Sequence, residues 1–433
     1  MNTKSFDPGK SAYLANYVQQ TGHKIEGDRC LLLYSGGLDT SCCLKYIQEE
    51  FGVQVVALTC DVGQSEDFKG IGQKAKKLGA EFIFEDAREL FYKNYIRTGI
   101  LMNATYGDAH PLASSLSRQA VVDCAAKIAA EQNIKVIAHG ATGRGNDSFR
   151  FDNAILSRLP DVKILAPIRN NHLTREMEMD YAAEQGIPVT ATKEKPYSID
   201  ENMWGREIEA GQLDNLQFEL PNDVLAWVHI PPTATDAAKL SFAFEKGEPV
   251  CVKIASKETD IQFTNMVDAI VYLNSFLGEY GIGRHDYLEE RASGFKVREV
   301  HESPSATLFL HAHKVLENAT LTSLELKTKR ELDATWAQCM VTGRIDPVVY
   351  GIEEFARFAN RRVSGEVTFN VLPNHYYLAA LNPRYGLDFR SVYKGDRKNF
   401  NQDLVAPTID LMDLSSRRAL QQHRQLQGNA SPC

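Results

Sequence analysis

A glycine turn between a predicted buried strand and a predicted helix is the feature that most constrains the fold. Residues Cys30–Tyr34 form a short apolar run typical of a buried strand, and apolar residues recur at helical spacing over Cys42–Ile47. The turn between them, Ser35–Ser41, reads SGGLDTS. Glycines let a ligand come close to the backbone, and the N–H groups at a helix N-terminus bind anions without a cationic side chain. The turn therefore predicts an anion site with three added hydroxyl donors.

Known nucleotide-binding motifs do not describe this turn. It lacks the lysine of the Walker phosphate loop, G-x-x-x-x-G-K-[ST], and it is not G-x-G-x-x-G. It resembles the pyrophosphate loop of enzymes that cleave ATP between the α- and β-phosphates. The alternative is a glycine turn that is capped by hydroxyl groups and binds nothing.

Composition excludes several classes of protein. The chain has 433 residues, 43% of them hydrophobic and 24% charged, which is enough for about two or three packed domains. A net charge of −8 argues against nucleic-acid binding through a broad basic surface. No apolar run approaches the length of a membrane span, and no signal-peptide core is recognisable at the N-terminus. The eight cysteines include no C-x-x-C pair, so we expect a protein of the reducing cytoplasm, away from membranes.

The first half of the chain alternates between strand and helix patterns. Further strands are predicted over 53–59, 81–84, 134–139 and 162–166, with helices over 68–78 and 118–132. This alternation predicts an α/β fold with a doubly wound parallel sheet over 29–185, which binds ligands at the carboxyl ends of its strands. Because the glycine-rich segments 35–37 and 140–145 both follow strands, we expect them at the same edge of the sheet.

A second domain is predicted over 186–395. Segments 250–254, 363–372 and 376–381 are typical of an antiparallel sheet, and long helices are predicted at 265–280 and 305–335. This indicates an α+β domain. The tail, 396–433, has helical spacing over Ile409–Leu426 and is expected to be exposed or packed on a partner. Residues 1–28 form an N-terminal extension to which the sequence assigns no role.

Longer motifs resemble one family. The segments His139–Phe151, Lys195–Arg206 and Gly281–Arg291 are similar, in order, to segments of argininosuccinate synthase. Asp61–Gln64 and Ala166–Arg169 match as well, and the resemblance extends over about 28–390.

The resemblance implies a synthetase that uses ATP to adenylate the ureido oxygen of citrulline, releases pyrophosphate, and joins aspartate in place of AMP. Such an enzyme acts mainly by positioning and charge stabilisation, with Mg²⁺ screening the triphosphate. Family members are homotetramers in which the second domains and C-terminal helices interlock, so we expect a homotetramer.

Carried over residue by residue, the resemblance assigns two sites. Asp39 orients magnesium or only caps the following helix, and Ser35 and Arg150 complete the catalytic set. Aspartate is held by Thr142, Asn146 and Asp147, of which Asp147 suits the substrate ammonium group. ATP is assigned to Leu33, Tyr34, Ser35, Gly36, Gly37, Asp39, Thr40, Ser41, Cys60 and Gly140.

The acceptor pocket is where the sequence departs from the family pattern. His110 and His301 stand where tyrosines are expected, and Glu207 replaces a serine, whereas the contacts Ser115, Asn146, Arg150, Ser198 and Glu289 are kept. Citrulline is one acceptor compatible with this pattern. The other is a differently substituted urea, amide or amidino compound, because an added acid and two histidines suit a substrate with an extra basic group.

Other features receive plain interpretations. His311 and His313 have ligand-like spacing, but a similar strand of the family carries no metal, and no metal site is expected in the chain. Lys74–Lys77 is expected to be a solvated helix face. Two rival classes remain, a different ATP-pyrophosphatase such as a sulfur-transferring tRNA enzyme, and a non-catalytic descendant kept as an interaction protein.

Overall fold

The computed structural model describes residues 27–107, 110–143, 145–188, 197–291, 294–392 and 400–428. Nearly all of the predicted N-terminal extension, residues 1–26, lies outside this set. By its contacts the chain divides into two units, one ending at Tyr385 and one beginning at Gly386, and each is described by itself. The predicted boundary near residue 185 lies within the first unit and stays a prediction.

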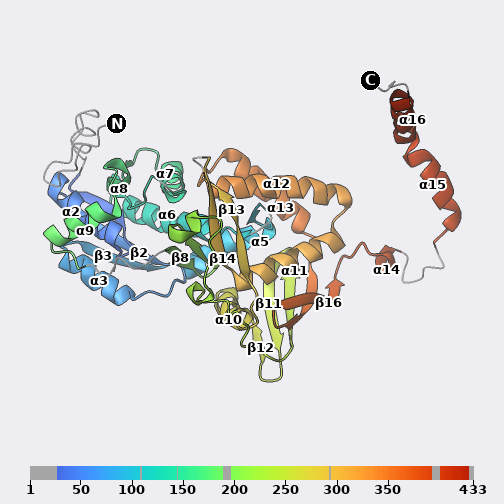
Figure 1. Cartoon of the computed structure of the whole chain (residues 1–433), viewed down its shortest axis with the longest axis horizontal. Helices are drawn as coiled ribbons and strands as arrows, with labels where there is room; N and C mark the ends of the chain where they lie inside the picture. The colour runs from blue at the N-terminus through green and yellow to red at the C-terminus, as the bar shows by residue number, and fades with distance from the viewer. Residues whose placement is uncertain are drawn as a thin grey trace. The chain divides into compact units, whose positions relative to one another are not determined.

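The first unit contains the predicted parallel sheet (Figure 1). Its five strands run in the order β3-β2-β1-β6-β7, and every neighbouring pair is parallel. This confirms the α/β prediction, because strands β1, β2 and β3 lie side by side and the chain then crosses to the other edge. The bounds are β1 (Arg29–Leu33), β2 (Gln54–Asp61), β3 (Glu81–Asp86), β6 (Val136–Ala138) and β7 (Lys163–Leu165).

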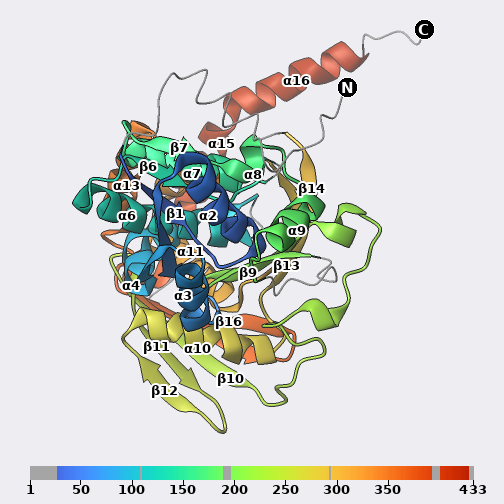
Figure 2. The ribbon, with the colours of Figure 1, turned by 90° about the vertical axis from the view of Figure 1, so that its left-hand side faces the viewer.

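Helices cover both faces of this sheet, as a doubly wound fold requires. Cys30 and Leu32 of β1 belong to one buried cluster, which they share with α2, α3 and α9, whereas Leu31 and Leu33 belong to another, shared with α6 and α7. Figure 2 shows α2 and α9 on one side of β1 and α6 on the other. The helices are α2 (Leu38–Phe51), α3 (Phe68–Lys77), α4 (Arg88–Phe91), α5 (Arg97–Leu101), α6 (Ala113–Glu131), α7 (Asp147–Arg158), α8 (Pro167–Asn170) and α9 (Arg175–Glu184).

Two antiparallel sheets complete the first unit and confirm the α+β prediction. One has the order β13-β14-β9-β8 and the other β12-β11-β10-β15-β16, while β4 (Thr105–Tyr106) pairs with β5 (His110–Pro111). The strands are β8 (Ser198–Asn202), β9 (Gly205–Glu209), β10 (Ala238–Glu245), β11 (Glu248–Ala255), β12 (Asp260–Phe263), β13 (Arg284–Glu290), β14 (Lys296–Glu302), β15 (Gly365–Leu372) and β16 (His375–Pro383). The helices are α10 (Met266–Glu279), α11 (Pro304–Thr320), α12 (Ser323–Val341) and α13 (Pro347–Asn360).

The single long helix predicted over 305–335 is wrong, because the chain breaks it into α11 and α12. Thr322 starts α12 with a capping box, in which its hydroxyl accepts from the N–H of Glu325 and the Glu325 carboxylate accepts from the N–H of Thr322. The T-x-x-E pattern was visible in the sequence. His311 and His313 lie on α11, not on a strand as the family pattern suggested.

The regular elements in the described residues of the second unit are helices. They are α14 (Phe389–Val392), α15 (Val405–Met412) and α16 (Leu414–Gly428), with a short 3₁₀ turn at Gln402–Leu404. The predicted tail helix over 409–426 is therefore interrupted at Asp413, which leaves the helical region of the backbone. All residues from 401 to 426 are exposed, among them Ile409 and Leu411. No helix in the described ranges is both long and apolar enough to cross a membrane.

Candidate active site

A single cavity of about 1370 Å³ extends from the glycine turn to the four-stranded antiparallel sheet. Its walls include the segments that follow β1, β2 and β6. The two glycine-rich segments meet here, since a Cβ placed on Gly140 would lie 2.9 Å from Thr40 Cγ2. This confirms that both segments lie at the same edge of the parallel sheet.

The turn after β1 forms one end of the cavity. Gly36 has φ of +76°, and a Cβ there would approach Ile71 to 2.8 Å, so both its conformation and its surroundings favour glycine. Ser35 Oγ accepts from the N–H of Gly37 at 3.3 Å and contacts Thr40 Oγ1 at 3.1 Å. All residues assigned to ATP line the cavity except Ser41, which is buried and donates to the Gly37 carbonyl at 2.6 Å.

Lys74 brings a cation to this turn from α3. Its Nζ donates to the carbonyl oxygen of Gly36 at 2.8 Å, and the side chain lines the cavity. Burial lowers its pKa, and the charge of Cys42 as a thiolate would oppose this effect. The expectation that Lys74–Lys77 is only a solvated helix face is therefore wrong for Lys74.

Two carboxylates lie beside the turn. Asp39 lines the cavity and pairs with Arg175 at 3.2 Å. Glu178 on α9 is buried, and its Oε2 has no hydrogen-bond partner. Burial, followed by the negative charge of Asp39, raises the pKa of Glu178 to about 9. Glu178 therefore keeps its proton at neutral pH beside the Asp39 carboxylate, and two carboxyl groups that share one proton can bind a hard divalent cation such as Mg²⁺ when that proton leaves.

Asp147 lies between two arginines in the middle of the cavity. Its carboxylate contacts Arg118 Nη2 at 2.8 Å and Arg150 Nη1 at 3.0 Å, and Arg118 also pairs with Asp200 at 2.9 Å. Burial raises the pKa of Asp147, but the charges of Arg118 and Arg150 outweigh that effect and lower it to about 2. The ionised carboxylate therefore fixes both guanidinium groups, in addition to any contact with a substrate ammonium group.

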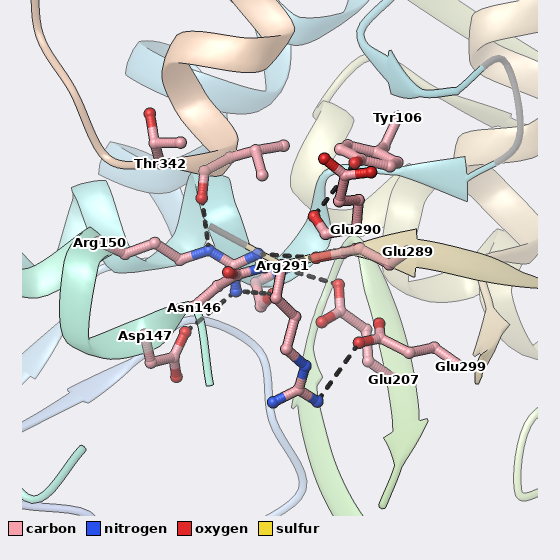
Figure 3. A network of polar contacts seen from close by, with 12 residues as sticks. Tyr106, Asn146, Asp147, Arg150, Glu207, Glu289, Glu290, Arg291, Glu299 and Thr342 are labelled. Atoms are coloured by element: carbon pink, nitrogen blue, oxygen red, sulfur yellow. Dashed lines mark hydrogen bonds and ion pairs between the residues drawn. The ribbon is translucent and has the colours of Figure 1, made fainter. Parts of the chain in front are cut away.

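Arg150, Asn146 and Glu289 converge at the other end of the cavity (Figure 3). Asn146 Nδ2 donates to Glu289 Oε1 at 2.6 Å, and Arg150 Nη2 is 3.8 Å from the same oxygen. The Arg150 Nε–H donates to the carbonyl of Val341 at 3.0 Å. Although burial raises the pKa of Glu289, its hydrogen bond with His110 and the charge of Arg150 lower it to about 2.

The acceptor residues predicted from the sequence do not all reach the cavity. Glu207, Ser198 and Glu289 line it, as do Thr142, Asn146, Asp147 and Arg150. His110 and His301 are buried behind the wall, where their rings stack with centroids 3.8 Å apart. Ser115 is buried as well, and its neighbour Ser114 lines the cavity instead.

Several residues of the site were missed from the sequence. Ser114 donates its backbone N–H to Glu207 Oε1 at 3.0 Å, and its hydroxyl accepts from Arg150 at 2.9 Å. Arg291 pairs with Glu209 and lies 3.8 Å from Glu299. Only their positions in the sequence could have pointed to these residues. Ser114 precedes Arg118 on α6, and Arg291 is the last residue of the Gly281–Arg291 motif.

Comparison with known proteins places the chain in a family. Residues 29–188 match the arginosuccinate synthase N-terminal HUP domain, and residues 197–419 match the arginosuccinate synthase C-terminal domain. The argininosuccinate synthase of Methanocaldococcus jannaschii is 38% identical over 382 residues, which cover 88% of this chain and 94% of the relative. That of Pyrococcus furiosus is 37% identical and covers 90% and 93%, and that of Dictyoglomus turgidum is 36% identical and covers 90% and 97%. The chain therefore belongs to the argininosuccinate synthase family.

Proposed function

We propose that this protein is an ATP-dependent carbon–nitrogen ligase that joins citrulline and aspartate to give argininosuccinate, AMP and pyrophosphate. The observation that carries the proposal is the continuity of one cavity from the Ser35–Ser41 turn to Arg150 and Glu289. In such a cavity an α-phosphate and a ureido group can lie next to each other, as transfer between them requires.

The chemistry explains why the site needs cations and positioning more than a nucleophile. A urea carbonyl is a poor electrophile, so its oxygen first attacks the α-phosphorus and pyrophosphate leaves. The aspartate amine then attacks the ureido carbon, loses a proton, and AMP leaves with the former ureido oxygen. Cys60 lines the cavity, but its hydrogen bond with Cys124 and its burial raise its pKa well above the usual range. A thiolate mechanism, such as that of a sulfur-transferring enzyme, is therefore disfavoured.

At the ATP end, we assign phosphate binding to the backbone N–H groups of the turn, to the hydroxyls of Ser35 and Thr40, and to Lys74. Asp39, with Glu178 behind it, would hold Mg²⁺, whose charge offsets that of the triphosphate. Arg175 keeps the Asp39 carboxylate oriented toward the turn. Glu178 would give up its proton when the cation binds, because its raised pKa reflects burial next to Asp39.

At the substrate end, we assign the aspartate carboxylates to Thr142 and Asn146 and the aspartate ammonium group to Asp147. Arg150 lies between Asp147 and Glu289, so its guanidinium can stabilise the negative charge that develops on the transferred phosphate. Glu289, ionised at neutral pH, suits the amino group of the acceptor. Ser198 and Glu207 would border the same substrate.

We further propose that the enzyme acts in the cytoplasm as a homotetramer. Seven cysteines in the described ranges are all free thiols, which suits a reducing compartment. The exposed apolar side chains of α15 and α16 supply a surface for contact between subunits.

The decisive experiment follows the ureido oxygen. The full-length protein would be incubated with ATP, Mg²⁺, aspartate and citrulline carrying ¹⁸O in the ureido group. We expect argininosuccinate, pyrophosphate and AMP in equal amounts, with the label in AMP. Formation of ADP and phosphate, or label retained in the condensed product, would contradict the mechanism. In parallel, a panel of other ureas and amides tests the acceptor, and faster turnover of one of these than of citrulline would replace citrulline in the proposal.

A further inference from the structure

Three side chains from distant parts of the sequence meet behind the acceptor end of the cavity. They are His110 on β5, Glu207 on β9 and His301 on β14, and one nitrogen or oxygen of each lies within 4.8 Å of the others. These are the three positions at which the sequence departs from the tyrosines and serine expected there. The three residues that differ from the family pattern therefore lie next to each other in the folded protein.

The fold holds the three residues in place from separate strands. Glu207 and His301 are directly opposite each other in the antiparallel pairing of β9 and β14. His110 reaches them from β5, where its ring stacks on that of His301 at 3.8 Å between centroids. Both histidines are buried, at 3% and 0% exposure, so their positions are set by packing.

His301 has a nitrogen without a partner. Its Nε2 lies 3.0 Å from Glu299 Oε2. When the Glu299 carboxylate is ionised it can only accept, and this nitrogen then carries the hydrogen. Nδ1 is then a lone-pair acceptor. It is buried with no hydrogen-bond partner and faces Glu207 Oε1 at 3.6 Å. Two acceptor atoms that face each other in a buried site are repulsive, and a cation between them removes the repulsion.

His110 offers a lone pair in the same way. Its Nδ1 lies 2.8 Å from the carbonyl oxygen of Pro111 and must donate to it, so Nε2 of the neutral ring is an acceptor. Nε2 is 2.7 Å from the hydroxyl of Tyr287 and 3.4 Å from Glu289 Oε2, to which it donates only when the ring carries a second proton. That hydroxyl has a second acceptor, Glu289 Oε2 at 3.1 Å, so Nε2 can exchange Tyr287 for a cation without leaving the hydroxyl unpaired.

The outer contacts are those of metal-binding histidines. A ligating histidine usually donates its other ring N–H to a carboxylate or a backbone carbonyl, which fixes the tautomer and aims the free nitrogen at the ion. His301 does this with Glu299, and His110 does it with Pro111. Glu207 is oriented by the backbone N–H of Ser114 at 3.0 Å.

We propose that His110, Glu207 and His301 form a binding site for a divalent first-row transition metal, and that Zn²⁺ is its ion. Two imidazoles and one carboxylate are a ligand set that Zn²⁺ accepts, and Ca²⁺ and Mg²⁺ prefer all-oxygen sites. Glu207 lines the cavity, so a fourth ligand, a water or a group of the acceptor, can enter from that side. The site revises the expectation from the sequence that the chain binds no metal of this kind.

Metal binding can be measured directly and independently of the ligase activity. The full-length protein without an affinity tag would be stripped with a chelator and titrated with Zn²⁺ against a chromophoric competitor. We expect one ion per chain. Co²⁺ should occupy the same site and show the intense visible bands of a four- or five-coordinate ion, which added Zn²⁺ abolishes.

The variants separate a built site from surface binding. Glu207→Gln keeps an oxygen for the N–H of Ser114 but removes the charge, and we expect the affinity for Zn²⁺ to fall at least about 100-fold. Glu299→Gln, which alters the outer contact of His301 and also the contact of Glu299 with Arg291, should cost roughly 10–100-fold. His285→Gln is the matched control, because His285 lies opposite His301 on β13 and bonds to Thr307 at 3.0 Å without belonging to the triad. Exposed His375→Gln controls for surface binding.

The outcomes decide the proposal. Full affinity in both control variants, with loss in Glu207→Gln at an unchanged unfolding temperature, supports the site. Wild-type affinity in Glu207→Gln, or substoichiometric binding with the spectrum of hydrated Co²⁺, overturns it. NMR of ¹⁵N-labelled histidines gives a further test, because a His301 ring protonated on both nitrogens at pH 7 would show that a proton occupies the gap and would also overturn the proposal.

Discussion

Lys74 donates a hydrogen bond from Nζ to the carbonyl oxygen of Gly36 at 2.8 Å. This contact joins α3 to the turn after β1. The turn lacks such a lysine in the sequence, and a neighbouring helix supplies the cation. If the turn binds a triphosphate, as proposed, tertiary structure supplies its lysine.

Replacing Lys74 with methionine should weaken ATP use. The side chain keeps its length but loses a charged hydrogen bond worth about 1.5–3 kcal/mol, so we expect kcat/KM for ATP to fall roughly 10–100-fold. Initial rates of pyrophosphate release measure this. Lys76→Met is the matched control, since Lys76 lies on the same helix and is exposed outside the cavity. Equal rates in both variants would show that Lys74 does not bind the nucleotide.

Much of the fold could be predicted from the sequence because its signals are local. The apolar runs of β1, β2 and β3 and the glycines after β1 and β6 specify a parallel sheet and a ligand-binding edge. The match of the His139–Phe151 segment to the family motif likewise predicted that Asn146, Asp147 and Arg150 lie together.

What escaped prediction depends on side-chain contacts between distant segments. Lys74 follows the polar spacing of an ordinary helix surface, and nothing in that spacing shows which lysine reaches the turn. The same holds for His110 and His301. An alignment of motifs gives their positions in sequence, but packing against Tyr287 places them behind the cavity wall. Nor does the motif show that Ser41 lies outside the cavity, where its hydroxyl donates to the carbonyl of Gly37.

Glu178 should make the protein less stable as pH rises. Its pKa is raised from 4.5 to about 9, so the folded state holds its proton more tightly than the unfolded state does. Its contribution to stability is fully present below pH 4.5 and is lost as pH rises through about 9. We expect Glu178→Gln to have a higher unfolding temperature than the wild type at pH 8.5 and a smaller advantage at pH 5.5. Parallel pH dependence of the two proteins in thermal scans would contradict this.

Asp147→Ala should abolish product formation while leaving ATP binding nearly unchanged. The substitution removes the group assigned to the substrate ammonium and frees Arg118 and Arg150 from their shared partner. ATP affinity, measured by calorimetry without aspartate, reports on the turn. It should stay within about twofold, a free-energy change well below the 1.4 kcal/mol that corresponds to a tenfold change in binding. Asp147→Asn removes the charge but keeps the shape of the side chain, so it separates the effects of the two. Product formation at the wild-type rate by either variant would remove Asp147 from the site.

The tail should be required for assembly. Ile409 and Leu411 on α15 are exposed at 57% and 74%, which is costly for large apolar side chains unless a partner covers them. We expect the full-length protein to scatter light as a tetramer at micromolar concentration. Ile409→Lys with Leu411→Lys should give smaller species, whereas Thr408→Lys, on the same helix, should not. A monomeric wild type would contradict the proposal.

Acceptor preference should depend on Glu207 more than on the two histidines. Glu207 lines the cavity, whereas His110 and His301 lie behind it, so only the carboxylate can contact a substrate directly. Without a metal ion on Glu207, it and Glu289 make this end of the cavity acidic, which favours an acceptor that carries a positive charge and weakens binding of one with an exposed carboxylate. Glu207→Ser restores the residue expected from the family pattern. If the native acceptor differs from citrulline, we expect this variant to raise kcat/KM for citrulline, and the triple variant with His110→Tyr and His301→Tyr to raise it further.

Loss of the contact to the N–H of Ser114 should lower the stability of the Glu207→Ser variant by about 0.5–2 kcal/mol, so rates are compared at a temperature well below unfolding. A wild type that already uses citrulline at ordinary efficiency, together with a slower Glu207→Ser variant, would show that Glu207 belongs to a repacked citrulline pocket.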